Sequence, residues 1–78
     1  MIEEVYKLLK ENVEELEDVD LKEDTSLIAS GFMDSYEVIK MLEKIEDTFS
    51  ITINLDELNL EDFEKPKNIA KMIMTKRG

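Results

Sequence analysis

The segment Gly31–Ile45, with the sequence GFMDSYEVIKMLEKI, contains the end of a loop and the beginning of an amphipathic helix. Asp34 is a favourable N-cap residue, because its carboxylate can accept hydrogen bonds from N–H groups of the first turn. Glu37 follows three residues later and completes the pattern of a capping box. Ser35 is therefore predicted at the first helical position, where its hydroxyl lies beside unpaired backbone donors. A phosphate attached there would meet those donors and the positive end of the helix dipole.

A single serine at a helix start is most often only a polar residue, so the meaning of Ser35 depends on its surroundings. Gly-x-x-Asp-Ser at Gly31–Ser35, midway along a small acidic chain, resembles the attachment site of acyl and peptidyl carrier proteins. In that family the motif is usually Asp-Ser-Leu, and the serine carries a phosphopantetheine arm. Asp24–Leu27 is similar to the family's Asp-x-Ser/Thr-Leu loop element, and Phe49–Ile53 is similar to its segment after the second helix. The resemblance covers nearly the whole chain.

The resemblance implies a carrier and not an enzyme. A phosphopantetheinyl transferase would move 4'-phosphopantetheine from coenzyme A to Ser35, and the thiol of the arm would hold an acyl or aminoacyl group as a thioester. Asp34 would support this modification by approaching the magnesium ion of the transferase. The acidic second helix would then dock on basic surfaces of the enzymes that load and process the cargo.

Two positions depart from the pattern of fatty-acid carriers. Tyr36 replaces the usual leucine after the serine, and Lys40 stands where those carriers usually have an acidic residue. Some carriers of amino acids, such as D-alanyl carriers, have an aromatic residue after the serine. These departures favour a stand-alone carrier of a specialised pathway, but fatty-acyl, polyketide and aminoacyl cargo all stay open. The alternatives are a D-alanyl-type or other aminoacyl carrier, and a carrier-like helical interaction module that is not modified.

Composition excludes several other classes of function. The 78 residues include no cysteine and no histidine, which excludes a disulfide framework and Ser-His or Cys-His catalysis. A calcium-binding EF-hand loop starting at Asp18 would need Gly at its sixth position and Glu at its twelfth, but Glu23 and Ala29 stand there. The sequence therefore predicts no metal site. A small hydrolase that uses Ser35 is equally disfavoured, since no histidine is present to activate the hydroxyl.

The charge is large and unevenly distributed. The net charge is −10; all 20 acidic residues and five of the ten basic ones precede Lys65, so that this part carries −15. Such a surface repels nucleic acids and anionic membranes and accelerates encounters with basic protein surfaces. No apolar run has the length of a membrane span, and the first residues lack the pattern of a signal peptide. We therefore expect a soluble, cytoplasmic monomer that neither binds nucleic acid nor inserts into membranes.

Apolar spacing predicts the remaining elements as a small all-α four-helix bundle in a single domain, residues 1–78. A first helix carries one apolar stripe from Ile2 to Leu16. A long loop follows, and its apolar residues are expected to pack against the core: Val19, Leu21, Leu27, Ile28 and Phe32. The second helix runs from about Ser35 to Phe49. Its predicted inward residues are Val38, Ile39, Leu42, Ile45 and Phe49, with Met41 at the edge, and its predicted partner-binding stripe is Tyr36, Lys40, Glu43 and Asp47.

The last third of the chain is predicted to hold a connector and two helices. Ile51–Leu55 alternates apolar and polar residues, but a single strand without a partner is unstable, so we expect an extended connector. A short helix is expected from Asp56. Its apolar anchors would be Leu58, Leu60 and Phe63. A last helix should begin at Pro66 and end at Gly78, with Ile69, Ala70, Ile73 and Met72 facing inward.

Overall fold

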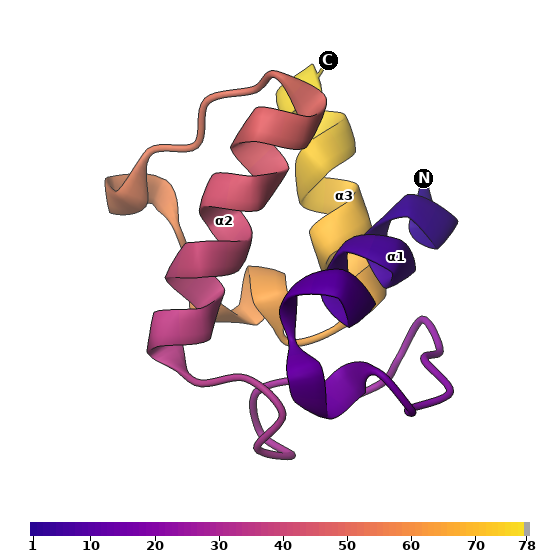
Figure 1. Cartoon of the computed structure of the whole chain (residues 1–78). Helices are drawn as coiled ribbons and strands as arrows, with labels where there is room; N and C mark the ends of the chain where they lie inside the picture. The colour runs from indigo at the N-terminus through magenta and orange to yellow at the C-terminus, as the bar shows by residue number, and fades with distance from the viewer. Residues whose placement is uncertain (78) are drawn as a thin grey trace.

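The computed structural model describes residues 1–77, which fold into helices and irregular segments without a β-strand (Figure 1). The expected all-helical fold is confirmed. The expected helix end at Gly78 lies outside the described residues. The α-helices are α1 (Ile2–Asn12), α2 (Ser35–Phe49) and α3 (Pro66–Arg77), and the 3₁₀ turns are η1 (Glu14–Leu16), η2 (Leu55–Glu57) and η3 (Leu60–Phe63).

Helix α1 ends earlier than the apolar stripe predicts. Val13 adopts an extended backbone with φ −119° and ψ 104°, and the amide of Asn12 donates a hydrogen bond to the Leu8 carbonyl at 2.8 Å. This side-chain bond satisfies one carbonyl of the last turn, and a β-branched residue follows where the helix stops. Val13 and Leu16 are nevertheless fully buried, so the stripe faces the core as predicted although its last part is a 3₁₀ turn.

Helix α2 has the predicted bounds, but its buried face differs from the predicted one. Met41, expected at the edge, is 1% exposed, whereas Ile39, expected inside, is 39% exposed. The reason is helical geometry. Val38 and the residues three, four and seven positions later form one face, and Ile39 lies about 100° away from Val38 around the helix axis. The buried residues of α2 are Val38, Met41, Leu42 and Ile45.

The segment after α2 is an extended connector followed by two 3₁₀ turns, where the sequence predicts one short helix. Leu58 and Asn59 both have extended backbones, which separate η2 from η3. Neither turn therefore extends into a longer helix. Phe63 is buried, as expected, and Ile53 of the connector is buried as well. Leu60 is 54% exposed, so the prediction that it anchors this segment was wrong.

Helix α3 begins at Pro66 as predicted, and Ile69, Ala70 and Ile73 face the core. It packs against α1 and α2, and the C-terminal ends of α2 and α3 lie close together (Figure 1), with Arg77 5.7 Å from the centre of the Phe49 ring. A cavity between the three helices is too small for a water molecule; its lining residues are Val5, Leu8, Leu9, Met41, Ile45 and Ile69. No helix within residues 1–77 combines the length and the apolar character needed to cross a membrane.

Candidate functional site

The N-terminal end of α2 has the predicted capping box. The backbone N–H of Glu37 donates to Asp34 Oδ1 at 2.9 Å, and the backbone N–H of Asp34 donates to Glu37 Oε1 at 3.4 Å. Asp34 has an extended backbone, and Ser35 is the first residue of the helix. Both residues are exposed. The Ser35 hydroxyl is therefore accessible at the positive end of a 15-residue helix.

The four residues of the predicted partner-binding stripe are all exposed along α2. Tyr36 is 70% exposed, and Lys40 Nζ lies 5.5 Å from the centre of its ring, which is a cation–π distance. Ile39 also lies on the exposed part of the helix, an apolar contribution that the sequence pattern missed. The structure therefore brings one aromatic, one aliphatic and several charged side chains onto the exposed part of the helix that begins at Ser35. Glu43 and Asp47 are the acidic residues of the predicted stripe.

The loop before α2 is fixed by Glu64, a residue that the sequence did not single out. Its carboxylate accepts hydrogen bonds from three groups of the loop: the Ser26 hydroxyl at 2.5 Å, the Ile28 N–H at 3.0 Å and the Ala29 N–H at 3.0 Å. The hydrogen bond from Ser26 is the main cause that lowers the pKa of Glu64, and the two backbone N–H groups add to it against the opposing effect of burial. Only the fold brings residue 64 to this loop.

Backbone bonds and an ion pair add to this attachment. The Leu27 N–H donates to the Glu64 carbonyl at 2.8 Å, and the Lys67 N–H donates to the Glu23 carbonyl at 3.1 Å. Asp24 forms an ion pair with Lys67 at 2.6 Å, and this hydrogen-bonded partner lowers the pKa of Asp24. The Asp24–Leu27 loop element is thus bound to the start of α3.

Gly31 makes the turn that returns the loop to α2. Its N–H donates to the Ile28 carbonyl at 2.9 Å, and its φ of +86° lies in the left-handed region that favours glycine. No atom lies within 4 Å of the place where a Cβ would be, so the backbone angle and not crowding selects glycine.

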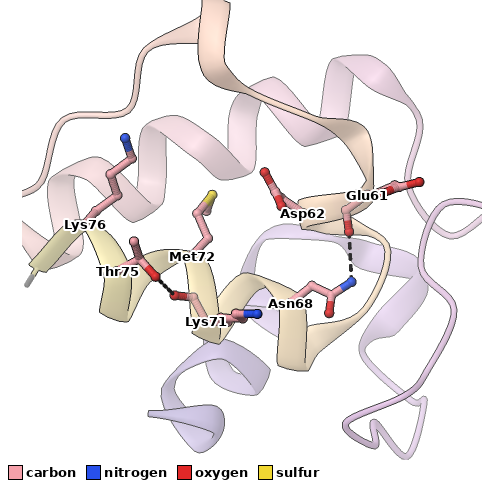
Figure 2. A pocket seen from close by; sticks show the side chains of 7 residues that line it. All are labelled: Glu61, Asp62, Asn68, Lys71, Met72, Thr75 and Lys76. Carbon is pink, nitrogen blue, oxygen red and sulfur yellow. Dashed lines mark hydrogen bonds between the residues drawn. The ribbon is translucent and has the colours of Figure 1, made fainter.

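A surface groove of about 390 Å³ lies between η3 and α3 and contains none of the predicted site residues. Figure 2 shows the side-chain amide of Asn68 donating to the Glu61 carbonyl, at 3.0 Å, across one end of this groove. Its other lining residues are Asp62, Lys71, Met72, Thr75 and Lys76. Among residues 1–77, no three acidic side chains come together as a metal site would require.

Comparison with known proteins identifies the family. Residues 4–73 match the family described as phosphopantetheine attachment site, which covers most of the chain, and the protein therefore belongs to this family of phosphopantetheine-binding carriers. Two relatives named D-alanyl carrier protein, from two strains of Lactobacillus delbrueckii subsp. bulgaricus, are each 34% identical to it over 50 residues. This region is 64% of the chain and 62% of each relative, so the match spans less than two thirds of the relatives' length.

Membership of this family means that the protein carries covalently attached 4'-phosphopantetheine. The N-terminal end of α2 fits such a group, because it combines an exposed hydroxyl with backbone donors and the positive end of a helix dipole. The Ser26 hydroxyl, by contrast, is engaged by Glu64. When attached, the group supplies a thiol that can hold a carried group as a thioester.

Proposed function

We propose that Ser35 carries the 4'-phosphopantetheine arm and that residues 1–78 act as one carrier domain for an aminoacyl group. The observation that carries this proposal is the exposed Ser35 hydroxyl at the first position of α2, directly after the capping residue Asp34. The protein presents the thioester to partner enzymes and does not itself catalyse a reaction.

The same helix end supports the modification in two ways. The phosphodiester formed at Ser35 adds a negative charge where the helix dipole is positive, which is favourable by roughly 0.3–1 kcal/mol at an exposed site. Asp34 uses Oδ1 for the cap. We propose that the carboxylate of Asp34 also approaches the magnesium ion of the transferase, as the resemblance to other carriers implies.

Three observations favour a small aminoacyl cargo of the D-alanyl type. Two relatives are named D-alanyl carrier protein. Tyr36 and Lys40 depart from the fatty-acid carriers. The cavity between α1, α2 and α3 that Met41 and Ile45 help to line is too small for a water molecule, so a long acyl chain placed there would have to force these side chains apart. A small amino acid at the end of the arm needs no such rearrangement.

We further propose that the exposed stripe of α2 binds the partner enzymes. Tyr36 offers aromatic contact area beside the attachment point, while Glu43 and Asp47 attract basic surfaces and raise the association rate. Charge reversal by Glu43→Lys should therefore lower the rate at which the carrier associates with a loading enzyme. The difference in association rate between this variant and the wild type should shrink at high salt.

The attachment is tested by mass spectrometry. The purified protein is incubated with coenzyme A and a phosphopantetheinyl transferase, and it should gain the mass of one arm. Ser35→Ala should abolish the gain, whereas the matched control Ser30→Ala, an exposed serine in the preceding loop, should keep it. If several transferases produce no gain in the wild-type protein, the chain is an unmodified interaction module instead.

The cargo is tested on the modified protein isolated from the cells that naturally produce it. A thioester with the mass of a small amino acid, released by hydroxylamine and absent from Ser35→Ala, would support the aminoacyl proposal. A fatty-acyl or polyketide mass on the same arm would overturn the cargo proposal and leave the attachment intact.

A further inference from the structure

The Glu64 carboxylate gathers three donors from one short loop, although 35 to 38 residues separate it from them in the chain. Glu64 and Ser26 are both half-buried, so water competes only partly for these bonds. Hydrogen bonds to a charged acceptor are stronger than those between neutral groups. This cluster is therefore a strong local constraint on the backbone of residues 26–29.

A continuous set of backbone contacts leads from Glu64 to the attachment point. The Leu27 N–H donates to the Glu64 carbonyl at 2.8 Å, and the Met33 N–H donates to the Leu27 carbonyl at 2.9 Å. Met33 is 2% exposed and directly precedes the N-cap Asp34. The two bonds on Leu27 therefore link both ends of the turn around Gly31 to Glu64, which directly follows η3.

We propose that Glu64 is a positioning residue for the modification of Ser35. Its carboxylate holds the loop Ser26–Asp34 in the single conformation that a phosphopantetheinyl transferase recognises. This inference rests on the proposed attachment at Ser35. Glu64 does not touch the reacting hydroxyl. Its carboxylate holds Ser26, Ile28 and Ala29, which lie on both sides of Leu27. The Leu27 carbonyl in turn accepts the hydrogen bond from Met33, the residue before the N-cap.

A carboxylate is required because the three loop groups are all donors. Glutamine has nearly the same shape but offers one acceptor oxygen and an NH₂ group, which is itself a donor. Glu64→Gln therefore leaves some of the donors of Ser26, Ile28 and Ala29 without an acceptor. Partly buried donors without an acceptor favour conformations in which the loop opens to water.

Loop opening should change the KM for the carrier but leave kcat unchanged. If only a fraction of the molecules has the competent loop, the apparent affinity for the transferase falls by that fraction. Bound molecules still present Ser35 correctly. The KM for the carrier should therefore rise while kcat at saturating carrier stays the same.

The experiment measures phosphopantetheine transfer from coenzyme A, by mass, as a function of carrier concentration and well below the melting temperature. Glu64→Gln should raise the KM by about tenfold, the change expected for about 1.4 kcal/mol, and should keep kcat. The matched control Glu61→Gln removes the same charge from η3, where the side chain is exposed, and should behave as the wild type. In NMR spectra, Glu64→Gln should also shift the amide signals of Ile28 and Ala29.

Ser26→Ala keeps the test decisive if Glu64→Gln fails to fold, because it removes only one of the three donors. It should raise the KM in the same direction but by less, about threefold, as expected for a partial loss of the cluster. Lower melting temperatures with unchanged KM in both variants would show that Glu64 is merely structural and would overturn the proposal. A wild-type protein that is not modified at all would instead refute the attachment at Ser35.

Discussion

The irregular segments on the two sides of α2 are held in different ways. The loop before the helix, residues 17–34, has three fully or nearly buried anchors, Leu21, Leu27 and Met33, and is bound to Glu64. The segment after it, residues 50–62, is anchored at Ile53 and leads to the buried Phe63. Between these anchors, Leu55 is 60% exposed and Leu60 is 54% exposed.

Polar contacts show the same contrast. In the second segment the Ile53 N–H donates to Glu46 at 2.9 Å, and an exposed ion pair joins Glu57 to Lys76 at 2.9 Å. Exposed pairs of this kind contribute little, commonly about 0–1 kcal/mol. Of the two segments, the one that leads into the proposed attachment point is thus more tightly fixed than the one that leaves the same helix.

The largest expected effect separates the two segments by their leucines. Leu27→Ala should lower the free energy of unfolding by about 2–5 kcal/mol, because it removes a completely buried side chain from the loop. Leu60→Ala, the same substitution in the second segment, should change it by about 0.5 kcal/mol or less. Urea unfolding followed by circular dichroism measures both. Equal losses would contradict the contrast between the two segments.

The next effect compares the two ends of α2 through one residue type. Asp34→Ala removes the cap and should cost about 1 kcal/mol of stability, as well as slowing the modification of Ser35. Asp47→Ala, the control, removes an exposed aspartate near the negative C-terminal end of the helix. It should be neutral or stabilising by a few tenths of a kcal/mol, roughly. Thermal melts distinguish the two, and an unchanged midpoint for Asp34→Ala would mean that the capping box does not stabilise the helix.

Local signals predicted the N-terminal end of α2 better than the contacts that hold the loop before it. Asp34 and Glu37 are three residues apart, so their capping box could be read directly from the sequence, and α2 has the predicted bounds. The predicted positions of Ile39 and Met41 were wrong, because both side chains are apolar and only the angle around the helix axis distinguishes the inner face from the outer one. Glu64 could not be found, because its partners are 35 to 38 residues away and only packing brings them together.

The loss of stability in acid should distinguish Glu64, which binds the loop before α2, from Glu57, which forms the exposed ion pair with Lys76. The pKa of Glu64 lies below the ordinary value of 4.5, chiefly because Ser26 donates to it, so its stabilising contribution is complete above pH 4.5 and is lost as the pH falls through the lowered pKa. Lys76 also lowers the pKa of Glu57, but that pair is exposed and screened by salt.

Glu64→Gln should therefore remove more of the acid dependence of stability than Glu57→Gln. The measurement is the urea midpoint at a series of pH values from neutral down to the acid transition. The wild type and Glu57→Gln should lose stability with similar slopes below pH 4.5, while the slope of Glu64→Gln should be flatter. Parallel curves for all three proteins would show that the Glu64 cluster contributes no more than the surface pair.

The smallest effect concerns the two left-handed residues that flank α2. Ser50 caps the C-terminal end with φ 55°, whereas Gly31 makes the turn before the helix with φ 86°. A side chain in this region is strained, and glycine relieves the strain at the cost of more freedom in the unfolded chain. Ser50→Gly should therefore stabilise the fold slightly, by about 0.5 kcal/mol. Gly31→Ala should do the opposite, because its φ penalises a Cβ even though the space is open. If Ser50→Gly destabilised the fold in urea unfolding, contacts of the Ser50 side chain would have to outweigh its backbone strain.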